Sequence, residues 1–182
     1  MGAYNQVTQF GYDAEGNLRQ ITDPLQNTFS RQFDARNRLI GTTDAVGHHI
    51  RQAYDAMDQI IQISDPRDIA TTYTYNGFGD VIQEISTDRG TTTYTYDSAG
   101  NLETQMDARG VKHIYTWDAL NRPIKRIHVK VAGIPGTAAF VWSYDNGVNG
   151  IGRLTSVSDA SGSTTYGYDL HGRLLTKTQI AR

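Results

Sequence analysis

Polar and apolar residues alternate along several short stretches of the chain. Residues 72–75 (Thr-Tyr-Thr-Tyr), 93–96 (Thr-Tyr-Thr-Tyr) and 114–117 (Ile-Tyr-Thr-Trp) show this alternation clearly. Successive side chains of a β-strand point to opposite faces, so Tyr73 and Tyr75 would share one face of a strand. No segment carries an apolar stripe at helical spacing. The pattern therefore predicts short β-strands and no sustained helix.

From Tyr12 onward, an aromatic residue followed by Asp or Asn recurs eight times. The first six aromatic residues are each 21 residues apart, and the next two steps are 27 and 24 residues. A spacing this regular indicates an internal repeat. The pairs are Tyr12-Asp13, Phe33-Asp34, Tyr54-Asp55, Tyr75-Asn76, Tyr96-Asp97, Trp117-Asp118, Tyr144-Asp145 and Tyr168-Asp169.

Two further positions recur with this period. A turn-forming residue follows three residues after the Asp or Asn, at Gly16, Asn37, Asp58, Gly79, Gly100, Asn121 and Gly172. An aliphatic residue follows two positions later, at Leu18, Leu39, Ile60, Val81, Leu102 and Leu174; Pro123 replaces it in the sixth unit, and Leu154 takes this part in the expanded seventh unit.

These positions predict two strands and two turns in each unit. The Asp side chain can accept a hydrogen bond from the backbone two residues on, and Gly tolerates a positive φ, so Asp-x-x-Gly closes a turn. The second strand starts at the aliphatic residue, as in residues 18–22. A second Asp, at Asp23, Asp44, Asp65 and Asp107, then turns the chain back.

A single hairpin cannot bury its aromatic face alone, so neighbouring units must pair. Eight units, starting near 12, 33, 54, 75, 96, 117, 144 and 168, give about sixteen antiparallel strands. An open sheet of that many strands curls. We therefore expect an all-β protein in which tandem hairpins form one long curved strip or spiral over residues 1–182, without a sandwich core.

Composition agrees with this prediction. Ile and Val number 24 against nine Leu, and there are 21 Thr and 11 Tyr, the types that suit a pleated surface. The chain has no Cys, which excludes disulfides, thiol nucleophiles and Cys-ligated zinc. A formal net charge of −2 gives no reason to expect a nucleic-acid partner, and no apolar run is long enough for a membrane span.

The signature residues resemble a known family. Residues 96–102 (Tyr-Asp-x-x-Gly-Asn-Leu), 168–174 (Tyr-Asp-x-x-Gly-Arg-Leu) and 12–18 look like the motif of Rhs repeats, also called YD repeats. The resemblance extends over roughly residues 4–180. Departures are Asn76 for Asp, Phe33 and Trp117 for Tyr, Pro123 for the aliphatic residue, and inserts at 129–139 and 146–151.

The resemblance implies a structural function. Such repeats occur in bacterial Rhs polymorphic toxins, in shell-forming subunits of insecticidal toxin complexes, in wall-associated proteins and in teneurins. In the toxins the array forms a hollow β-shell around a toxic domain. The expected partners are therefore neighbouring repeats and an enclosed toxin domain, and the expected location is secreted or on the bacterial surface, with export signals outside this chain. We also expect the chain to be a stretch of a longer array that self-associates through exposed strand edges.

No residue set predicts catalysis, a metal or a cofactor. The recurring Asp residues occupy turn positions in most units, whereas a catalytic carboxylate pair would occur once. His48 and His49 are adjacent, so on a strand they would point to opposite faces and could not chelate one ion. Residues 145–150 lack the ligand pattern of a calcium loop and predict an expanded hairpin turn. Lys125, Arg126, His128 and Lys130 predict a solvated basic strand face.

A binding module is the alternative function. Aromatic side chains repeated on one face could stack on sugar rings or hold a partner protein, and Tyr73, Tyr94 and Tyr115 are the candidates. Packing against neighbouring strands is the competing explanation for these residues.

Overall fold

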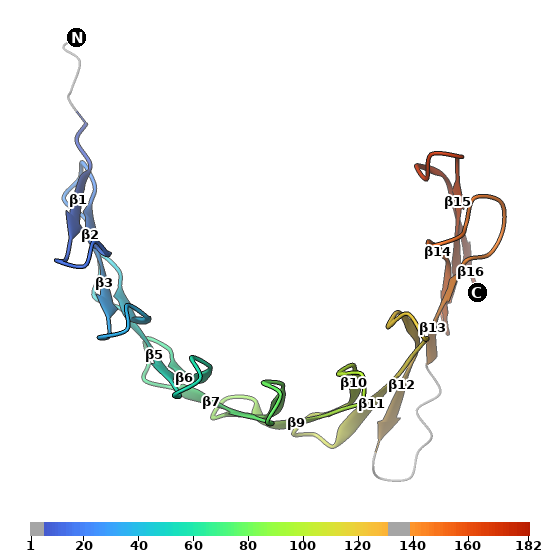
Figure 1. Ribbon diagram of the computed structural model, residues 1–182, viewed down its shortest axis with the longest axis horizontal. Helices are drawn as coiled ribbons and strands as arrows, with labels where there is room; N and C mark the ends of the chain where they lie inside the picture. Colours follow the sequence, from blue (N-terminus) through green and yellow to red (C-terminus); the bar gives the residue numbers. More distant parts are fainter. Residues whose placement is uncertain (1–5, 131–138) are drawn as a thin grey trace. The chain divides into compact units, whose positions relative to one another are not determined.

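A computed structural model describes residues 6–130 and 139–182 of the chain (Figure 1). Within these ranges the regular structure consists of sixteen strands and contains no helix. The strands are β1 (Gln9–Tyr12), β2 (Leu18–Thr22), β3 (Thr28–Phe33), β4 (Leu39–Thr43), β5 (His49–Tyr54), β6 (Ile60–Ser64), β7 (Ala70–Tyr75), β8 (Val81–Ser86), β9 (Gly90–Tyr96), β10 (Leu102–Met106), β11 (Val111–Trp117), β12 (Pro123–Lys130), β13 (Ala139–Tyr144), β14 (Leu154–Asp159), β15 (Gly162–Tyr168) and β16 (Leu174–Ala181).

The strands stand in the sheet in the order of the sequence, and each is hydrogen-bonded to the next. The pairing is antiparallel, as in β5 with β6 and β11 with β12. This order confirms the prediction of an all-β protein made of tandem hairpins. The insert predicted at residues 129–139 lies largely outside the described residues.

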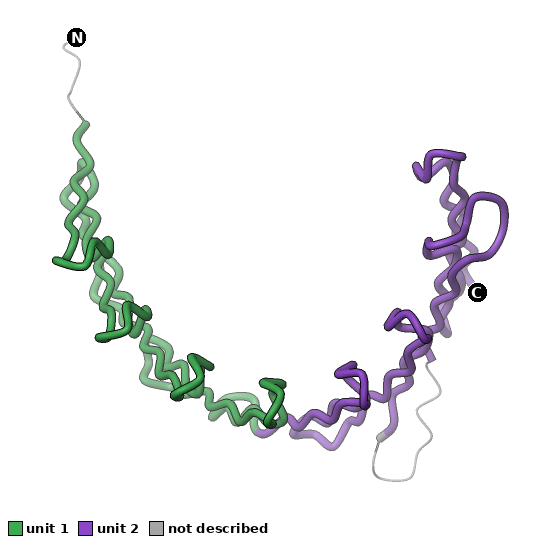
Figure 2. The backbone as a smooth tube through the Cα atoms, in the orientation of Figure 1, with its two compact units in different colours: residues 1–90 green, residues 91–182 purple. Residues whose placement is uncertain are grey.

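The chain divides into two compact units, residues 1–90 and residues 91–182 (Figure 2). The described part of the first unit contains the hairpins from β1 to β8. The second unit contains nearly all of β9 and the strands from β10 to β16. Both units are built from the same repeated hairpin.

The strand boundaries coincide with the repeat signature. All eight signature aromatic residues are the last residue of an odd-numbered strand, from Tyr12 in β1 to Tyr168 in β15. The aliphatic residues begin the following strands, as Leu18 does in β2 and Ile60 in β6. A shift in register beside the aromatic residue, between Ala53 and Tyr54 for example, marks a β-bulge in the hairpin.

No hydrophobic side chain in the described part of the chain is buried. The buried residues there are the polar Ser64, Ser86 and Thr155 and the glycines Gly41 and Gly150. Large apolar side chains are instead exposed at turn tips, and Phe78 is 94% exposed. The repeats therefore depend on strand pairing and on side-chain contacts between neighbouring hairpins.

Candidate functional site

The signature turns share one hydrogen-bond arrangement, which Asp97 illustrates. Its Oδ1 accepts hydrogen bonds from the backbone N–H groups of Ala99 and Asn101, both at 2.9 Å. Its Oδ2 accepts from Nδ2 of Asn101 at 3.0 Å, and its carbonyl accepts from the Gly100 N–H at 3.0 Å. The side-chain and backbone hydrogen bonds from Asn101 lower the pKa of Asp97. The carboxylate thus accepts from two backbone N–H groups of the turn, and the Asp97 carbonyl accepts from a third.

The same arrangement recurs around the array. Side-chain oxygens of Asp34, Asp55, Asn76, Asp118 and Asp169 also accept from the N–H groups two and four residues later. Asp13 accepts from the N–H of Asn17, and Asp145 accepts across its longer loop from Gly152. The second turn of the repeat uses the same chemistry at Asp23, Asp44, Asp65 and Asp107.

A left-handed backbone conformation explains the turn-forming residue. Gly16, Gly79, Gly100 and Gly172 have φ between 81° and 90°, a region where a side chain is strained. Asn37, Asp58 and Asn121 take the same place with φ between 58° and 64°, and Asn and Asp tolerate this region better than other side chains.

The signature aromatic side chains join one repeat to the preceding one. Tyr75 Oη donates a hydrogen bond to the carbonyl of Ile60 at 2.6 Å. Tyr54 Oη donates to Leu39, Trp117 Nε1 to Leu102 and Tyr168 Oη to Leu154, at 2.7–2.9 Å. Each acceptor is therefore the signature aliphatic residue of the preceding repeat. Phe33 stands at the equivalent place relative to Leu18 but has no donor.

The register of the strands explains why this carbonyl is available. Ile60 pairs with Tyr54 inside its own hairpin. On the other side of β6 the pairing with β7 begins only at Gln62 and covers three residue pairs. The backbone of Ile60 consequently lacks a strand partner on that side. The tyrosine side chain from the next repeat supplies the missing donor, a contact that the sequence pattern did not predict.

A second set of contacts links successive turns directly. Nη1 of Arg38 lies 2.7 Å from Oδ1 of Asp58 in the next turn, and Arg122 lies 2.6 Å from Asp145 in the same manner. Asn17 donates to Asn37 at 2.8 Å, and Asn101 donates to Asn121 at 2.9 Å. In each case the residue that ends one signature turn contacts the signature turn of the next repeat. These contacts form what we call the turn ladder.

Arginine side chains in these turns also cover aromatic rings. The guanidinium carbon of Arg38 lies 4.7 Å from the centre of the Tyr54 ring, and that of Arg122 lies 4.3 Å from the centre of Tyr144. Such cation–π contacts are worth roughly 0.5–1 kcal/mol at exposed sites. One arginine side chain thus links the Asp of its own turn, the aromatic residue of the next repeat and the signature turn of that repeat.

The three tyrosines proposed for ligand stacking lie in different repeats. Tyr73, Tyr94 and Tyr115 stand in the middle of β7, β9 and β11, opposite Glu84, Gln105 and Arg126. All three are half-buried. Tyr115 stacks on Trp117 of its own strand, with the ring centres 6.5 Å apart. These positions allow packing along the sheet.

The predicted basic cluster is only partly solvated. Lys125 is exposed, but Arg126 is half-buried with its guanidinium 4.4 Å from the centre of the Phe140 ring. His128 faces His113 across the strands with ring centres 4.3 Å apart, and burial together with the neighbouring His128 and Arg126 lowers the pKa of His113. The Lys130 side chain lies outside the described residues. Arg126 is half-buried and not solvated as predicted, because it packs against the ring of Phe140. Phe140 follows the insert at 129–139.

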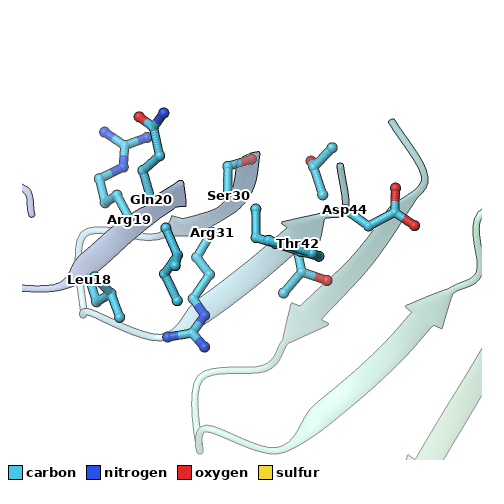
Figure 3. A pocket seen from close by; sticks show the side chains of 10 residues that line it. Leu18, Arg19, Gln20, Ser30, Arg31, Thr42 and Asp44 are labelled. Atoms are coloured by element: carbon cyan, nitrogen blue, oxygen red, sulfur yellow. The ribbon is translucent and has the colours of Figure 1, made fainter. Parts of the chain in front are cut away.

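The surface of the first unit carries several hollows, one of which has a volume of about 340 Å³ (Figure 3). Residues of β2, β3 and β4 line it, including Leu18, Phe29 and Thr42, together with Asp44. Across the described ranges, no group of three or more His, Cys, Asp or Glu residues could hold a metal ion. The described residues also include no helix with the length and apolar character needed to cross a membrane.

These features define a structural repeat protein: tandem hairpins, recurring Asp-type turns and links between neighbouring repeats, with no buried hydrophobic side chain among the described residues. The family model for the teneurin YD-shell matches residues 1–132, and the model for the RHS repeat matches residues 149–181. The chain belongs to the teneurin YD-shell family, a family of structural shell repeats. The resemblance to Rhs/YD repeats is thereby confirmed.

Solved structures show the same fold. The crystal structure of TcdB2-TccC3-Cdc42 superposes with a TM-score of 0.73 and 20% identity, covering 93% of this chain and 10% of that chain. The crystal structure of TcdB2-TccC3 without its hypervariable C-terminal region gives 0.72 and 19% over the same shares. The chain thus spans about a tenth of the length of these neighbours. No curated protein matches it.

Proposed function

We propose that this chain is a non-catalytic wall segment of a β-shell that encloses a toxin domain and helps to deliver it. In this proposal residues 1–182 act as one array of about eight repeats. Its partners are neighbouring repeats of the same shell and the enclosed polypeptide. The protein carrying it would be secreted or displayed on a bacterial surface.

The absence of a buried hydrophobic side chain from the described residues carries this proposal. A catalytic site needs rigid, closely packed supporting residues, whereas a shell wall needs length and regular links between units. The turn ladder and the Tyr–carbonyl hydrogen bonds are links of that kind, because they repeat along the array and involve only adjacent repeats.

The edges of the array fit the same function. Among the described strands, β1 and β16 each have a pairing partner on one side only. All eight residues of β16 are exposed. Unpaired strand edges accept further strands, so neighbouring repeats of a longer shell would pair here, and isolated chains would associate with one another.

The family and the fold neighbours support the finer part of the proposal. Membership of a YD-shell family makes a wall the expected role. One fold neighbour is the crystal structure of TcdB2-TccC3 without its hypervariable C-terminal region, and part of it resembles this chain in fold. We infer that the present repeats enclose a comparable variable cargo.

A protease-protection experiment tests the enclosure. A protease-labile reporter polypeptide is joined downstream of a complete array that contains these repeats, and its cleavage is compared with cleavage of the same reporter added as a separate chain. Enclosure predicts slower cleavage of the joined reporter, with protection lost when urea unfolds the strands. Equal cleavage of both reporters, while circular dichroism still shows the folded sheet, would contradict enclosure.

A further inference from the structure

Asn is followed by Gly at three places, Asn76-Gly77, Asn146-Gly147 and Asn149-Gly150. In such a pair the backbone nitrogen of Gly can attack the side-chain amide of Asn, because Gly has no Cβ to hinder the approach. The attack requires a free Asn side chain and a free Gly N–H. The three pairs differ in how far hydrogen bonds engage the Asn side chain and the Gly N–H.

The side chain of Asn76 is fixed by the Asp-type turn that it forms. Its Oδ1 accepts from the N–H groups of Phe78 and Asp80, at 2.9 and 3.0 Å. Its Nδ2 donates to Oδ2 of Asp80 at 2.9 Å. Three hydrogen bonds must therefore open before the amide can turn toward Gly77.

Asn149 is held at both reacting groups. Its Nδ2 donates to the carbonyl of Tyr168 at 3.2 Å, and the N–H of Gly150 donates to the carbonyl of Gly147 at 3.4 Å. Gly150 is also buried, and a Cβ there would overlap the carbonyl of Asn146. The attacking atom of this pair, the backbone nitrogen of Gly150, is thus both hydrogen-bonded and buried.

Asn146 has neither restraint. It lies exposed at the start of the expanded turn after β13, and Gly147 beside it is exposed with φ of 73°. Within the described residues, no hydrogen bond engages the Asn146 side chain or the Gly147 N–H. Both reacting groups are free, and the turn lacks the close side-chain restraint of the other Asp-type turns.

We propose that Asn146 is a site of spontaneous deamidation in the folded protein. The Gly147 nitrogen forms a bond to Cγ of Asn146, and the bond from Cγ to Nδ2 breaks. Ammonia leaves with the proton that Gly147 gives up, and a five-membered cyclic imide remains. Water then opens the imide at either carbonyl and leaves aspartate or isoaspartate, with no change in oxidation state.

The product would change the link between two repeats. Asp145, the neighbour of Asn146, accepts hydrogen bonds from the guanidinium of Arg122 in the preceding repeat at 2.6 and 3.2 Å. Deamidation places a second negative charge beside this pair, and isoaspartate lengthens the backbone immediately after Asp145. The modification therefore acts on the turn ladder between the sixth and seventh repeats.

Peptide mapping by mass spectrometry tests the proposal with the three Asn-Gly pairs as internal controls. The intact chain is incubated in mildly alkaline buffer, with and without urea. In the folded chain Asn146 should convert about tenfold faster than Asn76 and Asn149, because hydrogen bonds must first open at those two sites. In urea the three rates should converge.

Two results would overturn the proposal. One is conversion of Asn76 or Asn149 in the folded chain as fast as conversion of Asn146. The other is the same tenfold ranking in urea, which would assign the difference to local sequence and not to the fold. The variant Asn146→Ser should lose the fast conversion while its circular dichroism stays unchanged.

Discussion

Removing the hydroxyl of Tyr75 isolates one link between two repeats. The variant Tyr75→Phe keeps the ring and deletes only the hydrogen bond of 2.6 Å to the carbonyl of Ile60. A typical intramolecular hydrogen bond contributes about 1 kcal/mol to stability, with a range of roughly 0.5–1.5 kcal/mol. The carbonyl of Ile60 has no strand partner on that side, so we expect a loss of about 1 kcal/mol.

The chain offers a matched control and a reverse variant. The hydroxyl of Tyr73, on the same strand, makes no hydrogen bond in the described part of the chain, so Tyr73→Phe should leave stability within roughly 0.5 kcal/mol. Phe33→Tyr should add a donor opposite the carbonyl of Leu18 and stabilise the first unit by about 1 kcal/mol. Because Phe33 and Tyr75 lie in separate repeats, the effects of Phe33→Tyr and Tyr75→Phe should add.

Urea unfolding followed by circular dichroism measures these changes, since the midpoint shifts with the free energy of unfolding. Hydrogen exchange of the β5–β8 amides shows whether the Tyr75→Phe loss is local. Equal losses for Tyr73→Phe and Tyr75→Phe would refute the reasoning. An unchanged or destabilised Phe33→Tyr variant would also contradict a general Tyr–carbonyl link.

Three further predictions concern the turns. Asp97→Ala should lower the urea midpoint clearly more than Asp97→Asn, because an amide oxygen makes the same turn contacts at Asn76. Acid should weaken the array, because hydrogen bonds hold the pKa values of Asp97 and Asp118 below their usual 3.8. The contribution of these carboxylates to stability is present above that pH and disappears as the pH falls through the folded-state pKa values. A pH series of urea unfolding curves would show this loss. A double-mutant cycle with Arg38→Met and Asp58→Asn should give a favourable coupling that shrinks in high salt; additive effects of the two changes would exclude a link between these turns.

Local chemistry is what made the fold predictable from sequence. Alternation of side chains along a strand and the Asp turn both act within a few residues, so the bounds of β2 and β7 follow from the positions of Leu18 and Tyr75. The 21-residue period then fixed the number of strands. The expanded seventh unit also kept its hairpin, with Leu154 at the start of β14.

Contacts between repeats were not predictable in the same way. Arg38 and Asp58 are twenty residues apart, and their contact depends on how adjacent hairpins stand in the sheet. The signal was nevertheless present, because a donor-bearing aromatic residue follows an aliphatic residue by 15 positions in four repeats, at Tyr54, Tyr75, Tyr96 and Trp117. The importance of this spacing depends on the strand register, which leaves the carbonyl of the aliphatic residue without a strand partner. The register could not be derived from the sequence.

Native-state hydrogen exchange tests most directly the claim that contacts between neighbouring repeats, and not a hydrophobic core, stabilise this array. The claim predicts graded protection: amides of the inner hairpins should exchange most slowly, and protection should decline toward β1 and β16, which pair on one side only among the described strands. A single rate of global opening shared by all strands would instead reveal one cooperative core and contradict the account.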